Sequence, residues 1–390
     1  MPVIAEIEDL RRMHRRRVPR MFYDYVDVGS WSGSTYRANR DDFDRILLRQ
    51  RVARDIERRS LASRMMGEDV SMPVALAPVG LLGMQHADGE IQAARAARDA
   101  GVPFTLSTMS ICSIEDVAAA TRAPFWFQLY TLRDEEFLDN VLDRARRAGV
   151  EMLVLTLDLQ IQGQRHADLR NAMTAPPRLT VANLIDMARR PHWCAGMART
   201  KRRGFGNIIG HARGVTNMGD LMEWTSRQFD QRLDWARVEQ IIAKWGGKVI
   251  LKGINDPEDA QRAVQTGADA ILVSNHGGRQ LDGAPSTIRM LPAIRRAVGP
   301  EYPLYLDGGV QSGQAALKAI ASGADGVFIG RAFTYGLGAM GQAGVTRAIE
   351  IIRREMDITM ALCGVNDIAD FGPHCLWSPE LEQTFREGRG

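Results

Sequence analysis

Residues 274–283, Ser-Asn-His-Gly-Gly-Arg-Gln-Leu-Asp-Gly, place a histidine and an arginine at the end of an apolar run. The run, Ala270–Val273, has the composition of a buried strand. An imidazole that titrates near neutral pH can act as a general base. A guanidinium binds a carboxylate through two parallel hydrogen bonds. Gly277 and Gly278 allow the sharp backbone turn that brings Arg279 back beside His276. The stretch therefore predicts acid–base chemistry on a small anionic substrate.

The elements that position these groups are eight apolar runs, most of them followed by a helix-like stretch. Several runs come directly after a small residue and Gly, as Ala148-Gly149 and Thr266-Gly267 do, which is typical of a helix end. Apolar runs without alternation suit parallel strands that are buried on both faces. The pattern predicts an α/β fold, a (β/α)8 TIM barrel, rather than a doubly wound open sheet, because no division into two nucleotide-binding halves is visible. The predicted strands are Val74–Ala77, Phe104–Ser107, Trp126–Leu129, Met152–Thr156, Val249–Lys252, Ile271–Ser274, Leu304–Asp307 and Val327–Ile329.

Residues 1–390 are predicted to form a single domain with two parts outside the repeating units. Residues 1–72 form an N-terminal extension, and the barrel occupies residues 73–360. A long insertion, residues 166–230, follows the fourth strand and precedes a helix near Trp235–Lys244. A stretch of that length inside a compact domain is usually functional.

The net charge of the chain is only +3, but its basic residues are concentrated in two segments, Arg11–Arg17 and residues 178–213. Such segments favour an anionic surface. Nucleic acid is not expected, because base-stacking and groove-reading features are missing. Val181–Trp193 mixes Leu184, Ile185, Met187 and Trp193 with arginines, which suits a helix at a membrane surface. No charge-free apolar run reaches the length of about 18 residues that a spanning helix needs.

The active site of such a barrel lies at the carboxyl ends of its strands, so the residues that follow each strand are the candidates. They include one histidine, two arginines, a lysine, a tyrosine and several small polar groups. Metal binding fits poorly, because there is one candidate histidine and no cysteine or carboxylate cluster. Gly308-Gly309 and Gly330-Arg331 follow the last two strands, where barrels of this type often hold a phosphate. These end residues together predict a phosphate-bearing cofactor and a small acid substrate.

Four stretches resemble the FMN-dependent L-2-hydroxy acid dehydrogenase and oxidase family. They are Ser274–Asp282, Trp126–Tyr130, Leu251–Gly253 and Asp307–Gly309. The resemblance extends from about Tyr23 to Gly364, nearly the whole chain. Three further stretches are most similar to the membrane-associated bacterial L-lactate dehydrogenases within that family, namely Leu48–Arg51, Ser71–Gly80 and Leu106–Thr108.

The resemblance implies a role for each candidate residue and FMN as the cofactor. His276 would remove a proton from the substrate, paired with Asp158, and Tyr130 would contact the substrate oxygens. Lys252 would stabilise negative charge on the reduced flavin. The residues implied in binding the substrate carboxylate are Tyr25, Arg165 and Arg279. Those implied in holding FMN are Ala77, Pro78, Val79, Ser107, Gln128, Thr156, Lys252, Ser274, Asp307, Gly308, Gly309, Gln311, Gly330 and Arg331.

Two positions depart from the family pattern. Gln311 stands where members often carry Arg, so Arg331 is expected to supply the main positive charge toward the phosphate or ribityl chain. Met109 stands where glycolate oxidases carry Trp. Because methionine is smaller and flexible, a substrate larger than glycolate is expected to fit.

The expected activity is oxidation of L-lactate to pyruvate with transfer of electrons to a quinone. The resemblance also implies a homotetramer, peripheral on the cytoplasmic side of the cell membrane through residues 178–213. The spacing of the four cysteines does not suggest disulfide bonds, which is typical of a protein in a reducing compartment. The alternatives are an O2-dependent oxidase of glycolate, mandelate or longer-chain 2-hydroxy acids, an FMN barrel of another class such as an isomerase of a diphosphate, and a catalytically silent membrane-binding protein.

Overall fold

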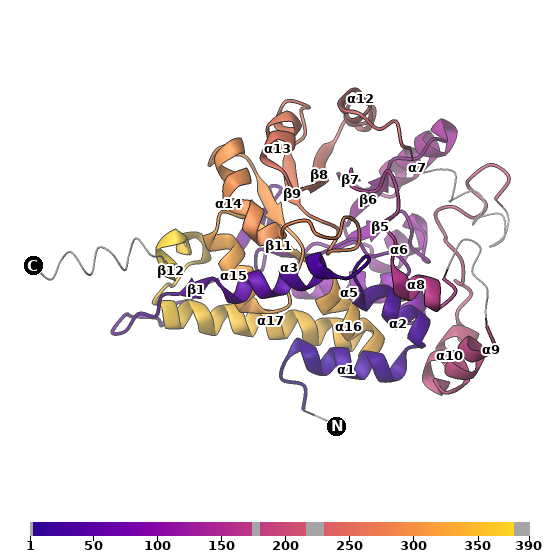
Figure 1. Ribbon diagram of the computed structural model, residues 1–390, viewed down its shortest axis with the longest axis horizontal. Coiled ribbons are helices and arrows are strands. Elements are labelled where there is room, and N and C mark those ends of the chain that lie inside the picture. The colour runs from indigo at the N-terminus through magenta and orange to yellow at the C-terminus, as the bar shows by residue number, and fades with distance from the viewer. Residues whose placement is uncertain (1–2, 174–179, 216–229, 378–390) are drawn as a thin grey trace, which may run out of the picture.

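The computed structural model describes residues 3–173, 180–215 and 230–377, and its centre is a barrel of eight parallel strands (Figure 1). Neighbours pair in the order β4-β11-β10-β9-β8-β7-β6-β5, and a bridge between Leu76 and Phe104 joins β4 to β5. The predicted TIM barrel is therefore confirmed, and each predicted strand overlaps an observed one. The strands are β4 (Val74–Leu76), β5 (Thr105–Ser107), β6 (Trp126–Tyr130), β7 (Met152–Thr156), β8 (Lys248–Ile254), β9 (Ala270–Val273), β10 (Leu304–Leu306) and β11 (Gly326–Ile329).

Helices surround the barrel, one after each strand. Local sequence signals start several of them: Ser113 and Asp116 form a capping box, and Asp256 caps a helix that begins at Pro257. The short α4 (Leu82–Gln85) precedes the first of these helices. They are α5 (Gly89–Ala100), α6 (Ile114–Thr121), α7 (Glu135–Arg147), α12 (Trp235–Trp245), α13 (Pro257–Val264), α14 (Thr287–Val298), α15 (Gly313–Ala321) and α16 (Arg331–Met340), with α17 (Gln342–Cys363) after the last.

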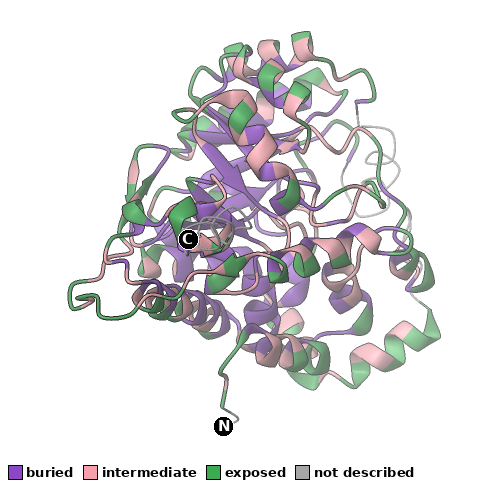
Figure 2. Ribbon diagram, turned by 60° about the vertical axis from the view of Figure 1, so that its left-hand side comes forward, coloured by how far each residue is buried: buried purple, intermediate pink, exposed green. Residues whose placement is uncertain are grey.

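The strands are buried on both faces (Figure 2), and their two faces belong to different clusters of side chains. Leu251, Val273 and Leu306 pack outward in the core shared with the helices. Ile250, Leu272 and Tyr305 belong to a second cluster that fills the barrel. Because side chains alternate along a strand, the residue two positions after each of the latter faces the same interior. Those residues are Lys252, Ser274 and Asp307.

A hairpin of β2 (Ser63–Met65) and β3 (Glu68–Val70) closes the amino end of the barrel. The backbone N–H of Met66 donates to the Tyr305 hydroxyl at 2.9 Å, and the Trp126 indole donates to Glu68 at 3.1 Å. The Lys248 ammonium donates to the Met66 carbonyl at 2.8 Å. Since Trp126 and Lys248 begin their strands, this plug lies opposite the carboxyl ends, where the predicted site residues emerge.

The rest of the N-terminal extension wraps around the barrel. It forms α1 (Ile7–Arg17), α2 (Arg20–Asp27), α3 (Ser34–Asp44) and β1 (Leu47–Leu48). Helix α1 packs on α16, and β1 pairs with β12 (Leu376–Trp377) near the end of the chain. Two short 3-10 turns, η1 (Ile368–Asp370) and η2 (Pro373–Cys375), precede β12.

The insertion carries α8 (His166–Arg170), α9 (Val181–Ala188) and α10 (Pro191–Arg199), and the last two stand at one edge of the molecule (Figure 1). Residues 174–179, with the predicted basic residue Arg178, and residues 216–229 lie outside the described part of the chain. Over residues 3–173, 180–215 and 230–377, no helix combines the length and hydrophobicity needed to cross a bilayer.

The composition of Val181–Trp193 predicts a segment at a membrane surface, but two of its apolar residues, Met187 and Trp193, pack against the protein instead. Both pack against the cluster around Phe22 and Met84. The Trp193 ring stacks on Phe22 at 5.5 Å, and its indole N–H donates to the Met84 carbonyl at 2.8 Å. Periodicity alone could not separate this buried side from the exposed one.

Candidate active site

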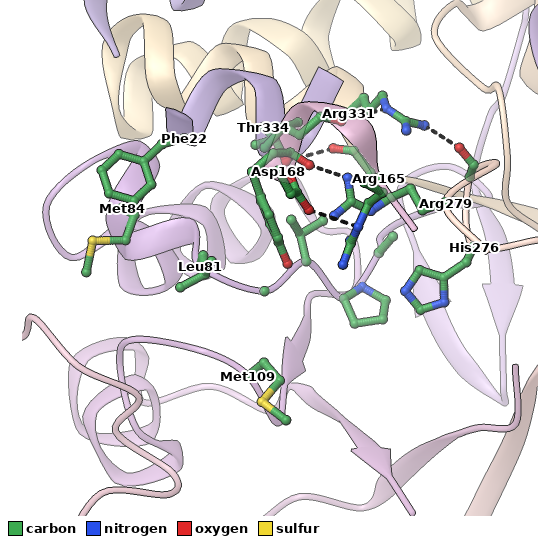
Figure 3. A pocket seen from close by; sticks show the side chains of 18 of the residues that line it. Phe22, Leu81, Met84, Met109, Arg165, Asp168, His276, Arg279, Arg331 and Thr334 are labelled. Atoms are coloured by element: carbon green, nitrogen blue, oxygen red, sulfur yellow. Dashed lines mark hydrogen bonds and ion pairs between the residues drawn. The ribbon is translucent and has the colours of Figure 1, made fainter. Parts of the chain in front are cut away.

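A cavity of about 610 Å³ opens at the carboxyl ends of the strands (Figure 3). Its lining is polar around His276, Arg165 and Arg279 and apolar around Phe22, Leu81 and Met84. Most of the predicted site residues meet here. Those in the lining are Tyr25, Ala77, Pro78, Val79, Met109, Tyr130, Arg165, Lys252, His276, Arg279, Asp307, Gly308, Gly309, Gln311, Gly330 and Arg331.

His276 and Asp158 form a partly buried pair across the loops after β9 and β7. The Nδ1 atom of His276 lies 2.9 Å from Oδ1 of Asp158. If Nδ1 carries the proton, Nε2 is left with a free lone pair in a residue that lines the cavity. The ring of Tyr130 lies nearly parallel to the imidazole, with 6.4 Å between centroids. The geometry is that of a general base whose tautomer is set by a carboxylate.

The electrostatics of the pair favour a neutral imidazole beside an ionised carboxylate. Burial lowers the pKa of His276 below its ordinary value, although the neighbouring Asp158 counteracts part of this effect. Burial opposes ionisation of Asp158, but the electrostatic interactions with His276 and Lys252 and the hydrogen bond from His276 outweigh it and lower the pKa of Asp158. A proton that reaches Nε2 would therefore create an imidazolium stabilised by a carboxylate.

The loop that carries His276 is held in an uncommon backbone conformation. His276 itself has φ +57°, a left-handed value rare for residues other than glycine. Gly278 has φ +73°, and a Cβ there would lie 2.6 Å from the backbone of Tyr36, so only glycine fits. Asp282 accepts hydrogen bonds from the backbone N–H groups of Ser32 and Thr35, each at 3.0 Å. The N-terminal extension thus clamps the catalytic loop.

Two arginines face the same tyrosine from the loops that follow β7 and β9. The guanidinium carbon of Arg279 lies 4.5 Å from the centroid of the Tyr25 ring, and that of Arg165 lies 5.6 Å from it. Arg279 also donates to the Tyr25 carbonyl. Burial and the nearby Arg165 lower the pKa of Arg279 to about 9, because two cations are held close together in a desolvated place. A bound carboxylate would relieve that repulsion.

Asp168 is a site residue that the sequence reasoning missed. Its Oδ2 lies 2.9 Å from Nε of Arg165, and its Oδ1 is buried without a hydrogen-bond partner in the described part of the chain. Burial raises the pKa of Asp168, against the opposing effect of Arg165. The available signal was the spacing: Arg165 and Asp168 are three residues apart at the start of α8, where such residues are neighbours.

We expect Asp168→Ala to lower kcat/KM by about 10- to 100-fold, the effect typical of losing a group that orients a ligand-binding residue. The loss should appear mainly in KM, since Arg165 would no longer be held toward the cavity. Steady-state kinetics measures it. Asp143→Ala, which removes an exposed ion pair of the same spacing with Arg146, is the matched control. An unchanged KM in the Asp168 variant would show that Arg165 needs no anchor.

Lys252 is a buried ammonium at the bottom of the cavity. Its Nζ donates to Ser274 Oγ at 2.7 Å and lies 3.2 Å from Oδ2 of Asp307. Burial opposes its charge, but Asp307 and Asp158 outweigh burial and raise its pKa. Lys252 therefore remains protonated and presents a fixed positive charge to whatever occupies the cavity.

The other end of the cavity is built mainly from backbone. Gly308, Gly309 and Gln311 line it, and α16 begins there at Gly330 without a side-chain cap. Uncapped N–H groups at the start of a helix bind anions such as phosphate. The Arg331 guanidinium is largely engaged: it donates to the carbonyls of Val26, Gly277 and Val28 at 2.8, 2.9 and 3.1 Å.

Ser107, Gln128 and Thr156 form a buried hydrogen-bonded row across β5, β6 and β7. Ser107 donates to Gln128 at 2.9 Å, and the Gln128 amide donates to Thr156 at 3.0 Å. These three, with Ser274 and Asp158, are not among the cavity-lining residues of the described chain. Their predicted contacts with the cofactor stay predictions.

Comparison with known proteins identifies the family of this chain. Residues 14–378 match the family described as FMN-dependent dehydrogenase. The chain belongs to the FMN-dependent dehydrogenase family. A protein of Allorhizobium ampelinum named L-lactate dehydrogenase is 44% identical over 375 residues, which cover 96% of this chain and 99% of that protein. One of Stenotrophomonas maltophilia with the same name is 44% identical over 371 residues, 95% of this chain and 98% of that protein.

Solved structures of the FMN-dependent dehydrogenase family share the fold. A structure described as the monotopic membrane protein (S)-mandelate dehydrogenase has a TM-score of 0.92 and 34% identity, and the match covers 96% of this chain and all of that one. A soluble mutant of the membrane-associated (S)-mandelate dehydrogenase from Pseudomonas putida has a TM-score of 0.81 and 34% identity, with 96% and 99% of the two chains covered.

The cavity fits FMN, the cofactor of this family. Small and apolar residues, Ala77, Pro78 and Val79, form one wall, as a planar ring requires. Oδ1 of Asp307 is buried without a partner in the part of the chain that the structure describes, so a polar group is available beside Lys252. The glycine-rich end and the start of α16 suit the phosphate.

Proposed function

We propose that this chain is an FMN-dependent L-lactate dehydrogenase that oxidises an L-2-hydroxy acid to the 2-oxo acid. The observation that carries the proposal is the meeting of the His276–Asp158 pair with Arg165 and Arg279 in one cavity that also suits FMN. His276 can act as a base toward the hydroxyl-bearing carbon of a small 2-hydroxy acid, and the two arginines can bind its carboxylate. The relatives named L-lactate dehydrogenase support lactate as the substrate.

FMN, when bound, supplies the acceptor for the two electrons that leave the substrate. Arg165 and Arg279 bind the substrate carboxylate, with Tyr25 between them. Nε2 of His276 accepts a proton from the substrate, and Asp158 stabilises the imidazolium that results. Burial raises the pKa of Tyr130, so its hydroxyl stays protonated and can donate to a substrate oxygen. Lys252 stabilises negative charge that develops beside it.

The same roles argue against an FMN barrel that isomerises a diphosphate. Two arginines on one tyrosine, with a histidine base beside them, suit a single carboxylate next to a hydroxyl-bearing carbon. The decisive test is anaerobic addition of L-lactate to the purified yellow protein, which should bleach the flavin absorbance. A spectrum unchanged by lactate and by other 2-hydroxy acids would reject the proposal, as would tight binding of a diphosphate without bleaching.

The apolar part of the cavity leaves room beyond the methyl group of lactate. Met84, Met109 and Phe22 line it together with Leu81 (Figure 3). Methionine side chains adapt to ligands of different shape. Longer-chain 2-hydroxy acids and mandelate are therefore the alternative substrates, and mandelate dehydrogenases are among the similar structures. Comparing kcat/KM for glycolate, lactate, longer-chain acids and mandelate decides between them.

The proposed acceptor is a quinone, and the proposed location is the cytoplasmic side of the cell membrane. Exposed Val181, Leu184 and Ile185 on α9 supply an apolar contact within the basic segment 178–213. The membrane-associated mandelate dehydrogenase supports peripheral attachment.

Reoxidation rates of the reduced enzyme with a quinone analogue and with O2 test the proposed acceptor. Light scattering tests the proposed tetramer.

The pH dependence of kcat/KM should report His276 in the free enzyme. His276 must be neutral to accept a proton, so activity is full above its pKa and lost as pH falls through that pKa. Because burial lowers that pKa, the acid limb should lie below the ordinary value of about 6.5. Asp158→Asn removes a charge that raises the pKa and should move the limb further down. An acid limb above the ordinary value would contradict this assignment.

A further inference from the structure

The two basic segments of the sequence, far apart along the chain, meet in the folded protein. Arg190, at the junction of α9 and α10, donates to the Arg16 carbonyl at the end of α1 at 2.6 Å. The backbone N–H of Arg20 at the start of α2 donates to Asp186 of α9, also at 2.6 Å. The arginines of the N-terminal helix and those of the insertion therefore share one face.

A hollow of about 480 Å³ lies between these helices, and we name it the arginine hollow. Arginines from α1, α2 and the α9–α10 junction line it, with three aspartates and a tyrosine. The lining residues are Arg11, Arg15, Arg20, Tyr23, Asp24, Asp27, Asp186 and Arg190. Four guanidinium groups around one concave surface are a strong attractor for a phosphate.

The three aspartates in the wall each pair with one arginine, so the lining keeps a formal charge of +1, that of Arg15. Asp27 accepts from Arg11 at 2.8 Å and from the Tyr23 hydroxyl at 2.6 Å. Asp24 lies 3.2 Å from Arg20, and Asp186 lies 3.4 Å from Arg190. These carboxylates fix three of the arginines in place.

Some of the positive charge at this face has no internal partner. The side chain of Arg15, in the lining, forms no hydrogen bond or ion pair within the described residues. The exposed side chains of Arg16 and Arg189 also form no hydrogen bond or ion pair with the described residues. An outside anion is the partner that these groups lack.

Beside the arginine hollow, α9 exposes an apolar edge. Val181, Leu184 and Ile185 are 72%, 52% and 49% exposed, and their spacing puts them on one side of the helix. The adjoining side is anchored through Met187. An apolar edge next to arginines has the chemistry of a membrane interface, where acyl chains meet headgroup phosphates.

We propose that the arginine hollow binds the headgroup phosphate of an anionic phospholipid while the apolar edge of α9 enters the acyl layer. The inference rests on the proposed peripheral membrane contact and adds its lipid selectivity. It also assigns a role to α1, which lies outside the insertion that carries the apolar edge. Arg15 and Arg190 reach the phosphate from opposite helices.

The test uses the full-length FMN-loaded enzyme and co-sedimentation with vesicles of phosphatidylcholine, alone or mixed with phosphatidylglycerol. The Arg15→Gln/Arg190→Gln variant should bind the mixed vesicles about 30-fold less tightly, the effect expected for two arginines near an anionic surface. Arg40→Gln/Arg296→Gln, which removes two exposed arginines from α3 and α14, is the matched control. Arg15→Gln alone removes no internal contact and should give part of the loss with an unchanged melting temperature.

The outcomes separate this inference from the proposed membrane contact. If the wild type binds neither vesicle, the membrane contact fails. If it binds both equally and Leu184→Ser/Ile185→Ser abolishes binding to both, the membrane contact stands and the headgroup site is refuted. Equal losses in the arginine variant and its control refute the site as well. Release from mixed vesicles by soluble glycerol phosphate at low concentration would show a site for free phosphate instead.

Discussion

His276→Asn should lower kcat for L-lactate by about 10²- to 10⁴-fold, the usual contribution of a positioned general base. Asparagine is the replacement of choice because it tolerates the left-handed backbone at φ +57° better than other residues. The amide cannot take up a proton at neutral pH, so the proton transfer that we assign to Nε2 has no acceptor. Single-turnover reduction of the flavin, followed by its absorbance, measures the step directly.

The control for this prediction is His192→Asn, which changes an exposed histidine on α10. Its rate should match that of the wild type. Both variants should keep their flavin, because His276 contributes a side chain to the substrate part of the cavity rather than to its glycine-rich end. A His276 variant that retains FMN and reduces it at the wild-type rate would remove the base from the proposed mechanism.

Arg279→Met should lower kcat/KM for lactate by roughly 100-fold or more, the effect of losing one partner of a buried, hydrogen-bonded charge pair. The loss should be smaller for Arg279→Lys, which keeps the charge but not the two-pronged geometry. Methionine approximates the length of the aliphatic part of arginine, so packing over Tyr25 is partly preserved. Steady-state kinetics with lactate gives the ratio.

Two comparisons make the Arg279 result specific. Arg296→Met removes an exposed arginine from α14 and should leave the kinetics unchanged. Lactamide lacks the carboxylate, so its slow oxidation should respond much less to Arg279→Met than lactate oxidation does. Equal losses for acid and amide would mean that Arg279 supports the fold of the loop rather than the substrate.

The barrel was predictable because its signals are local. Each strand is a short apolar run between recognisable helix ends, and alternation along the strand sends Lys252 and Asp307 to the interior. The same reasoning placed His276 after the sixth strand and Asp158 after the fourth, and the structure brings their side chains to 2.9 Å across the end of β8. Apolar runs between helix ends therefore predict the fold, and the alternating direction of side chains along each strand predicts which residues form the floor of the site.

Contacts that depend on distant segments could not be read in this way. The role of Arg331 toward a phosphate stays a prediction, but the hydrogen bonds from its guanidinium to the carbonyls of Val26 and Val28, far away in the sequence, could not be foreseen. The inward orientation of Met187 and Trp193 depends on α2 and α4 lying beneath them. Asp168 carried a usable signal, its spacing from Arg165, but such pairs are common on exposed helices as well.

The contacts of the N-terminal extension affect how the enzyme folds during translation. The segment that carries Tyr25 packs on α16 and the 274–283 loop, and β1 pairs with β12 almost at the end of the chain. The N-terminal extension therefore cannot complete its contacts until α16 and β12 have been synthesised, which makes folding slow and leaves apolar helix faces uncovered meanwhile. We expect ribosome-bound chains that are stalled before β12 to be bound by chaperones and unable to retain the flavin.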